Sequence, residues 1–189
     1  MIRIGILGDI GSGKSYISKC FGYPVFNADK QVSKLYKKNR RIFLKLKKIL
    51  PKHFKSFPIN KKEVSNAILA KNNNLKKIVH VVHSEVRKEM NIFLKKNKKR
   101  KIVILDIPLL LENKLNKKND ILIFVQASKT KITKRLRKRL NYNNKILEIF
   151  KNIQLPLHYK RKKSKFVIKN NFSDKSVKKE VKKVLNKIL

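Results

Sequence analysis

The sequence predicts an α/β fold in which a parallel β-sheet is covered by helices on both faces. Short apolar runs, typical of buried strands, alternate with longer helical stretches, and this alternation needs crossover connections that leave the strands parallel. A glycine-rich loop directly follows the first apolar run. The chain has 189 residues, which suits one domain of ordinary size.

Five segments are predicted to form the strands of this sheet. They are Ile2–Leu7, Pro24–Asn27, Ile102–Leu105, Ile121–Val125 and the shorter Phe166–Ile168. A helix from Lys14 to about Phe21 is expected between the first two. In such sheets ligands bind beyond the carboxyl ends of the strands, which is where the glycine-rich loop falls.

A long helical insertion is expected between the second and third strands, because no strand pattern appears from Ala28 to about Asn97. Asn60 followed by Glu63 predicts a capping box at a helix start, and Phe54–Asn60 predicts a loop between helices. An apolar stripe at near-helical spacing predicts core packing for Leu75, Ile78, Val79, Val82, Val86, Met90 and Phe93. We expect this insertion to hold an acceptor substrate.

A second segment outside the sheet, Lys129–Lys163, precedes the last strand and carries a basic cluster of Arg135, Arg137 and Arg139. Arg135 and Arg139 lie four residues apart, so on one helix they would project together. Such a segment is typical of a mobile lid that closes over a nucleotide, although a solvated charged face explains the same residues.

The chain ends in a predicted amphipathic helix, Ser173–Leu189, with Ser173 as its cap. Its inward residues are expected to be Val177, Val181, Val184, Leu185 and Ile188. The whole chain is then a single domain with a core (about 1–28, 100–128 and 164–189), the insertion (about 29–99) and the lid (about 129–163).

The glycine-rich loop Gly8–Ser15 matches the phosphate-binding pattern Gly-x-x-x-x-Gly-Lys-[Ser/Thr] at every fixed position. Its glycines let successive N–H groups turn toward phosphate oxygens, while Lys14 reaches the outer phosphates. The Ser15 hydroxyl is a ligand for Mg²⁺, and the helix that follows favours anions at its start. A strand, this loop and a helix in succession predict a site for a nucleoside triphosphate.

Carboxylates gather near the ends of the predicted strands, although the chain has only 11 acidic residues. Asp9 lies in the loop, Asp29 follows the second strand, and Asp106 and Glu112 flank Pro108-Leu109-Leu110-Leu111 after the third. They can serve a common site with ATP and Mg²⁺, with Asp29 orienting or deprotonating an attacking hydroxyl. Alternatively, Asp29 caps the next helix and Asp106 satisfies N–H groups of a loop.

The formal net charge is +40, which would ordinarily indicate nucleic acid or an anionic surface as partner. The cations are mostly Lys and are spread over the whole length beside Asn and Ile, which favours a compositional origin. Arg, the residue preferred for bidentate contacts to bases and phosphates, is scarce. Neither specific nucleic-acid binding nor membrane binding is expected.

Cys20 is the sole cysteine, so an intrachain disulfide is excluded and a reducing cytoplasm is the expected compartment. Neither a signal-peptide layout nor an apolar stretch of about 20 residues is present. We expect a soluble protein that is a monomer or a weak homo-oligomer.

Several motifs in order resemble the dephospho-CoA kinase family over nearly the whole chain. The chain carries Gly11-x-Gly13-Lys14-Ser15 and then Asn27-Ala28-Asp29, which is similar to the family's Asp-Ala-Asp. Later elements are similar to its His-Pro-x-Val-Arg, Pro-Leu-Leu-x-Glu, Arg-Leu-x-x-Arg and Val-Ile-x-Asn motifs. Here these are His83–Arg87, Pro108–Glu112, Arg135–Arg139 and Val167–Asn170.

The resemblance implies a three-layer P-loop kinase fold with a five-stranded parallel sheet, a helical substrate subdomain and a lid. It implies ATP-dependent phosphorylation of the ribose 3′-hydroxyl of dephospho-CoA, with Mg²⁺ as cofactor and Asp29 as the base. The residues it implies for ATP are Gly8, Gly11, Ser12, Gly13, Lys14, Ser15 and Tyr16. It implies Asp29, Lys14, Arg135 and Arg139 for catalysis, Asp29, His83, Arg87, Pro108, Leu109 and Glu112 for substrate, and Ser15 for the metal, with Asp106 contacting it through water.

The chain departs from the family pattern at several positions. Asn27 replaces the first Asp, Tyr16 the usual Thr, Ser84 the Pro of the histidine motif, and Phe150 stands where the lid usually has Arg before Gln154. Two other functions stay open. One is phosphorylation of a different small acceptor, as in nucleoside monophosphate kinases, and the other is nucleic-acid binding with a vestigial phosphate loop.

Overall fold

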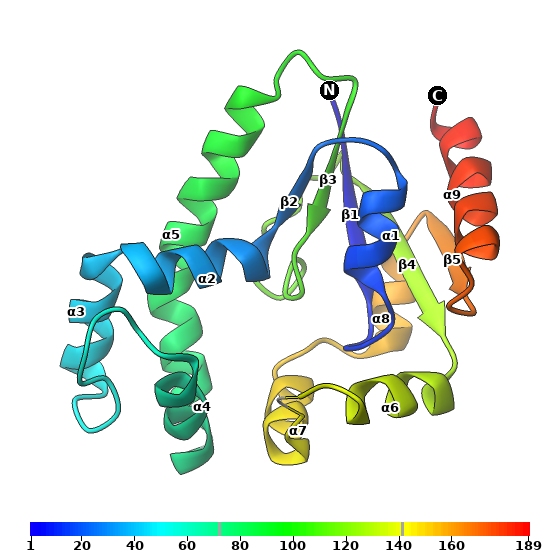
Figure 1. The fold of residues 1–189 in the computed structure, drawn as a ribbon. Coiled ribbons are helices and arrows are strands. Elements are labelled where there is room, and N and C mark those ends of the chain that lie inside the picture. The colour runs from blue at the N-terminus through cyan, green and yellow to red at the C-terminus, as the bar shows by residue number, and fades with distance from the viewer. Residues whose placement is uncertain (72, 141) are drawn as a thin grey trace. The chain divides into compact units, whose positions relative to one another are not determined.

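A computed structural model describes residues 1–71, 73–140 and 142–189 (Figure 1). The chain divides into two compact units. Unit 1 comprises Met1–Asn27, Phe93–Tyr142 and Leu155–Leu189, and unit 2 comprises Ala28–Ile92 and Asn143–Gln154. Two chain segments that are far apart in sequence therefore make up unit 2, and three make up unit 1.

Unit 1 contains a five-stranded sheet with the order β2-β3-β1-β4-β5, and every neighbouring pair is parallel. The strands are β1 (Ile2–Gly8), β2 (Val25–Asn27), β3 (Ile102–Asp106), β4 (Ile121–Ala127) and β5 (Phe166–Asn170). The predicted parallel α/β fold is confirmed. Most strands extend one or two residues beyond the predicted ends, because backbone pairing continues past the apolar runs that revealed them.

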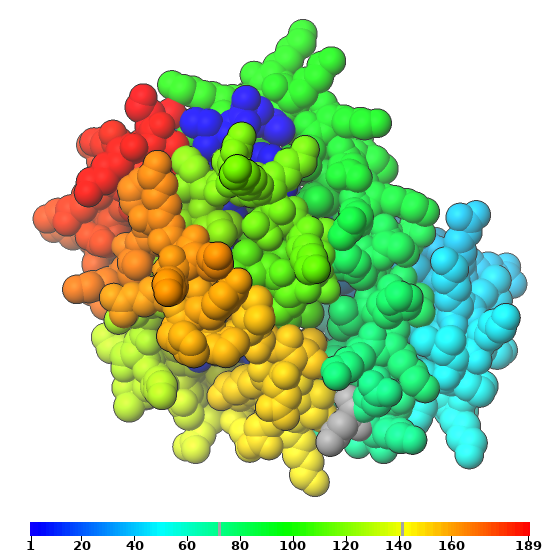
Figure 2. Space-filling model, turned by 180° about the vertical axis from the view of Figure 1, so that it is seen from behind, coloured from blue at the N-terminus to red at the C-terminus, as the bar shows by residue number. Residues whose placement is uncertain are grey.

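The two faces of the sheet are covered by different helices. Alternate strand residues, among them Ile4, Ile104 and Ile123, are fully buried in one cluster with α1 (Lys14–Cys20) and α9 (Asp174–Ile188). Helix α8 (Leu157–Lys163) packs on β1 and β4 from the other side. From behind, α8 and the residues after β3 largely hide the first strand (Figure 2).

Helix α9 confirms the predicted inward face, since Val177, Val181 and Val184 are buried and its last apolar residues pack against the same cluster. The predicted cap is wrong in one respect. Ser173 occupies the N-cap position, but its side chain makes no capping hydrogen bond. Asp174 in the first turn supplies negative charge at the positive end of the helix instead.

Helix α6 spans Lys129–Arg137 and is therefore shorter than the helix that the basic cluster predicted. Arg139 lies beyond its end, in a turn closed by a bond from the Arg139 N–H to the Leu136 carbonyl (3.0 Å). The expectation that Arg135 and Arg139 share one helix face is therefore wrong. A longer helix would place Lys131, Arg135 and Arg139 on successive turns, where like charges repel.

Unit 2 is helical, as expected for the insertion. It contains α2 (Ala28–Lys38), α3 (Arg40–Ile49), α4 (Lys61–Ala70), α7 (Asn144–Asn152) and α5 (Asn74–Lys96), whose last residues belong to unit 1. The predicted capping box of α4 is confirmed: Asn60 accepts from the Lys62 N–H at 2.9 Å and Glu63 accepts from the Asn60 N–H at 3.3 Å. Helix α7 packs on α4, and most of the predicted stripe of α5 is buried.

None of the helices in the described ranges combines the length and apolarity needed to cross a bilayer.

The centre of the sheet leaves no room for a side chain at Gly5. A Cβ there would lie 2.5 Å from Leu110 Cδ2 and 2.8 Å from Leu122 Cδ2. We expect Gly5→Ala to lower the free energy of unfolding by about 1–3 kcal/mol, because the buried leucines must leave their rotamers. Urea unfolding followed by circular dichroism measures this loss.

The double variant Gly5→Ala/Leu110→Val is the control for that explanation. It shortens the nearest contacting side chain, so it should be more stable than Gly5→Ala alone. A double variant that is less stable would show that the cost does not come from crowding against Leu110.

Candidate functional site

The phosphate-binding loop leaves β1 at Gly8 and enters α1 at Lys14. Gly13 is the N-cap of that helix and has a left-handed backbone (φ 93°), which only glycine adopts without strain. A Cβ at Gly13 would also lie 2.4 Å from Asn170 Nδ2. The loop is thus packed tightly from outside and depends on glycine there for two independent reasons.

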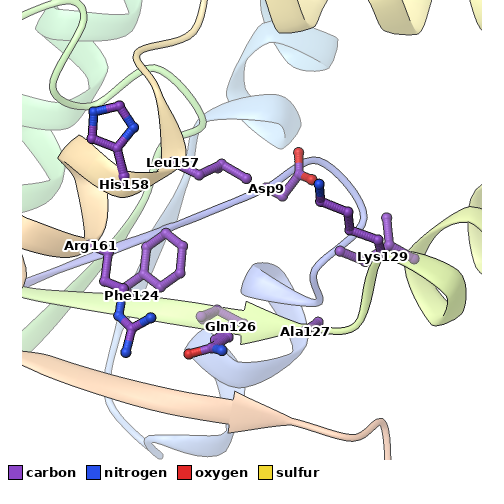
Figure 3. A pocket seen from close by; sticks show the side chains of 10 residues that line it. Asp9, Phe124, Gln126, Ala127, Lys129, Leu157, His158 and Arg161 are labelled. Carbon is purple, nitrogen blue, oxygen red and sulfur yellow. The ribbon is translucent and has the colours of Figure 1, made fainter.

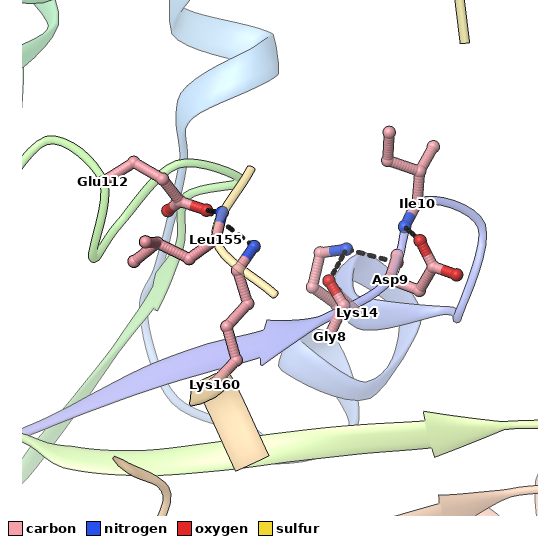
Figure 4. Close-up of polar contacts among 7 residues, drawn as sticks. All are labelled: Gly8, Asp9, Ile10, Lys14, Glu112, Leu155 and Lys160. Carbon is pink, nitrogen blue, oxygen red and sulfur yellow. Dashed lines mark hydrogen bonds and ion pairs between the residues drawn. The ribbon is translucent and has the colours of Figure 1, made fainter. Parts of the chain in front are cut away.

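The side chain of Lys14 folds back over the phosphate-binding loop. Its Nζ donates to the Gly8 carbonyl (3.0 Å) and to the Asp9 carbonyl (2.6 Å) (Figure 4). Asp9 Oδ1 accepts from the Ile10 N–H at 2.7 Å. The ammonium group therefore lies over the loop, which is the place from which a lysine reaches the outer phosphates of a nucleotide.

The two residues after Lys14 point away from the core. Ser15 is exposed, and its hydroxyl is available to ligands at the start of α1. The neighbouring Asp174 carboxylate, at the start of α9, raises the pKa of the exposed Tyr16 hydroxyl.

Asn170 braces the phosphate loop, a role that the sequence did not reveal. It is 4% exposed at the end of β5, and its Nδ2 donates to the Ser12 carbonyl at 2.7 Å. Its Oδ1 accepts from the Phe172 N–H at 2.8 Å. The sequence marked Asn170 only as the last residue of the Val-Ile-x-Asn motif and of an apolar strand, and neither signal names a partner 158 positions away.

Helix α6 lies against the other side of the loop. A Cβ at Gly11 would come within about 3.0 Å of Leu136 and 3.1 Å of Ile132. The guanidinium of Arg135 stacks over the Phe172 ring, with 4.6 Å from its Cζ to the ring centroid. Of the two predicted lid arginines, Arg135 is therefore held beside the loop, while Arg139 lies in the turn after α6.

Asp106 ends β3 and is 2% exposed. It accepts a hydrogen bond from Asn27 Nδ2 at the end of β2, which pairs with it in the sheet register. Asn27 thus orients the buried carboxylate. Asp29 belongs to unit 2, where it lies in the first turn of α2 and its carbonyl accepts from the Ser33 hydroxyl.

A metal centre built from protein side chains alone is absent from the described residues, which hold no cluster of three His, Cys, Asp or Glu. The exposed Ser15 hydroxyl fits Mg²⁺ only together with oxygens from a bound nucleotide. Mg²⁺ usually binds in this way, keeping several waters and using few protein ligands beside phosphates.

A cavity of about 250 Å³ lies between the end of β4 and helices α6 and α8 (Figure 3). Its wall combines apolar and charged side chains and includes Asp9 of the phosphate loop. The lining residues are Asp9, Phe124, Val125, Gln126, Ala127, Lys129, Ile132, Leu157, His158 and Arg161.

Glu112 makes its contacts inside unit 1. Its Oε1 lies 2.7 Å from Lys160 Nζ and accepts from the Leu155 N–H at 2.9 Å (Figure 4). Pro108 and Leu109, in the turn after β3, are partly buried. Of the residues predicted to bind substrate, these three are placed in unit 1.

The other three predicted substrate residues, Asp29, His83 and Arg87, belong to unit 2, where His83 and Arg87 lie one turn apart on α5. The pKa of His83 is lowered, mainly by burial and further by the charge of Arg87. His83 is therefore neutral at pH 7. Its Nε2 is buried and has no hydrogen-bond partner within the described residues.

Comparisons with known proteins agree with one another. The sequence model of a family described as dephospho-CoA kinase matches residues 2–176. A dephospho-CoA kinase of Wolbachia sp. subsp. Brugia malayi is 35% identical over 190 residues, covering 98% of this chain and 97% of that protein. The crystal structure of TT1252 from Thermus thermophilus superimposes with a TM-score of 0.76 at 25% identity, covering 100% of this chain and 98% of that one.

A structure of dephospho-CoA kinase from Campylobacter jejuni is also similar in fold. Its TM-score is 0.62 at 22% identity, with 98% of this chain and 96% of that chain covered.

The hydrogen bond from Asn170 to the Ser12 carbonyl leads to a prediction about nucleotide binding. We expect Asn170→Ala to weaken the affinity for MgATP roughly tenfold or more and to lower unfolding free energy by about 1–3 kcal/mol, because a buried carbonyl loses its donor. Titration calorimetry and urea unfolding measure the two effects. Lys169→Ala, at an exposed neighbour, should change neither, and an Asn170→Ala variant with normal MgATP affinity would show that the brace does not shape the loop.

Proposed function

The chain belongs to the dephospho-CoA kinase family, and we propose that it transfers the γ-phosphoryl group of ATP to the ribose 3′-hydroxyl of dephospho-CoA. The products are coenzyme A and ADP. The observation that carries the proposal is a complete phosphate-binding loop, with Lys14 across its mouth, in a chain that matches the family from residue 2 to 176.

The nucleotide is proposed to bind at the loop. N–H groups of the loop and of the start of α1 face the phosphates, with Gly8, Gly11, Ser12, Gly13, Lys14, Ser15 and Tyr16 as the residues involved. On binding, the Lys14 ammonium exchanges the loop carbonyls for phosphate oxygens, so its charge is already positioned where negative charge develops. The brace from Asn170 supports this geometry because it holds the Ser12 carbonyl from behind.

The Ser15 hydroxyl is proposed to hold Mg²⁺, with Asp106 contacting the ion through water. When bound, Mg²⁺ neutralises charge on the β- and γ-phosphates. Asp106 suits such an outer contact because its side chain is buried and oriented by Asn27.

Asp29 is proposed to orient the 3′-hydroxyl and to accept its proton as the oxygen attacks the γ-phosphorus. The bond from the γ-phosphorus to the β-γ bridging oxygen breaks, and ADP leaves with that electron pair. In phosphoryl transfer the protein mainly positions the reacting groups and stabilises charge. Arg135 and Arg139 are proposed to supply positive charge to the transferred group, and the stacking of Arg135 beside the loop supports its part in this role.

Dephospho-CoA is proposed to contact Asp29, His83, Arg87, Pro108, Leu109 and Glu112. His83 is neutral at pH 7 and can donate or accept a hydrogen bond, while Arg87 is exposed and offers charge to a phosphate of the substrate. The side chain at position 150 is Phe, so the charge that the family lid supplies there is absent, and Lys151 next to it is exposed.

We propose a reducing cytoplasm as the compartment, since the chain has a single cysteine, and a monomer or weak homo-oligomer as the working form.

The role of Asp29 is tested by Asp29→Asn. We expect a loss of kcat on the order of 10²-fold or more with MgATP affinity nearly unchanged, because the amide cannot take the proton but the nucleotide site is intact. Coupled detection of ADP and chromatographic detection of coenzyme A measure turnover. Lys14→Met should instead lose MgATP binding, and full turnover by Asp29→Asn would remove Asp29 as the base.

The choice of acceptor is tested by competition in the same assay. Dephospho-CoA should be consumed in preference to nucleoside monophosphates and other small alcohols supplied at equal concentration. Preference for a nucleoside monophosphate would replace the proposed acceptor while keeping the kinase. Formation of neither ADP nor coenzyme A under several salt conditions would contradict the proposal itself.

Binding to nucleic acid is expected to follow charge alone. Affinity for a random duplex should fall at least about tenfold between 50 and 200 mM salt, because binding by lysines releases counterions. Fluorescence anisotropy with duplexes of several sequences measures this. A sequence preference that persists at physiological salt would favour a nucleic-acid-binding function instead.

A further inference from the structure

Lys160 is a buried cation in a chain whose other lysines are overwhelmingly on the surface. It is 1% exposed, and its Nζ lies 2.7 Å from Oε1 of Glu112, whose side chain is 10% exposed. Removing two charges from water costs several kcal/mol per ion, which a surface lysine avoids. A surface cation elsewhere on α8 would serve solubility equally well, so the burial of this one calls for a specific cause.

The same Glu112 oxygen also accepts the Leu155 N–H at 2.9 Å. Leu155 is the residue at which the chain re-enters unit 1 after residues 143–154, which belong to unit 2. Figure 4 shows Lys160 and Leu155 approaching Glu112 together. The carboxylate therefore joins three places in unit 1: the turn after β3, the re-entry point at Leu155, and α8.

Glu112 cannot hold Leu155 in this way without Lys160. Its other oxygen, Oε2, is buried and has no hydrogen-bond partner within the described residues. Removing the cation from a buried ion pair leaves a buried charge without compensation, which is strongly destabilising. The Lys160 ammonium supplies that cation from one turn along α8.

We propose that Lys160 is a positioning residue for the phosphoryl transfer. It holds Glu112 in place, and Glu112 in turn anchors Leu155, so that the point at which the chain re-enters unit 1 is fixed. This rests on the proposed function for its effect on turnover, but the anchoring itself is independent of any substrate. Glu112 thus has a role inside the protein in addition to the substrate contact proposed for it.

The anchoring is tested by amide hydrogen exchange of the full chain without ligands. In the double variant Lys160→Met/Glu112→Leu, which removes both buried charges, the Leu155 amide should exchange at least about tenfold faster than in the wild type. Amides of β1 should keep their protection. Unchanged exchange at Leu155 would overturn the proposal, whatever the activity of the protein.

The effect on turnover is tested with matched variants and the dephospho-CoA assay. Lys160→Met leaves a buried carboxylate without its cation, so its thermal midpoint should fall by roughly 6 °C or more. The double variant should recover most of that midpoint, because apolar replacements of a buried pair are tolerated. Its kcat should nevertheless stay about tenfold or more below the wild type, with the KM for ATP changed less than about threefold, because misplacement of remote groups lowers the rate.

Lys162→Met, at an exposed position of the same helix, is the control and should match the wild type in all three measurements. Recovery of kcat together with the midpoint in the double variant would overturn the positioning role and leave the pair as a purely structural contact. A wild type without activity on dephospho-CoA would instead contradict the proposed function, and the exchange measurement would still decide the anchoring.

Discussion

The hydrogen bond from Asn170 to the Ser12 carbonyl is the contact on which the nucleotide side of the molecule depends. It joins the end of β5 to a loop that starts at the end of β1, although β4 lies between these strands in the sheet. Only a parallel sheet brings all strand ends to one edge, so that the last strand can hold the first loop. The same asparagine accepts the Phe172 N–H and so sets the position of Phe172. The Phe172 ring in turn sets the position of Arg135, which stacks on it.

Much of the fold could be predicted from the sequence because its signals are local. Buried parallel strands are continuous apolar runs, and the phosphate loop is recognised within eight residues, so both were predicted correctly. Asn170 with Ser12 and Lys160 with Glu112 could not be predicted, because each pair joins residues that only the tertiary fold brings together. The error at Arg139 has a different origin, since four-residue spacing indicates a shared face only while the helix continues.

Scarce carboxylates were expected to mark chemistry, but the structure shows four of the 11 in ion pairs of two kinds. Asp120 and Glu112 pair with the largely buried cations Arg3 and Lys160, at 2.9 and 2.7 Å. Glu85 and Glu180 form exposed i,i+3 pairs with lysines, which contribute little to stability. In a chain with a net charge of +40, carboxylates are therefore also needed to neutralise the few cations that folding buries.

The two interpretations of Asp29, helix-start residue and catalytic base, are compatible rather than competing. Asp29 lies in the first turn of α2, where the helix dipole stabilises negative charge. A carboxylate is a weak base, and a weak base suffices when the transferred phosphoryl group is loosely bound to both oxygens in the transition state. In the role proposed for Asp29, a fixed position at the helix start would help to place the carboxylate beside the attacking hydroxyl, and such positioning is the larger part of what this reaction requires from the protein.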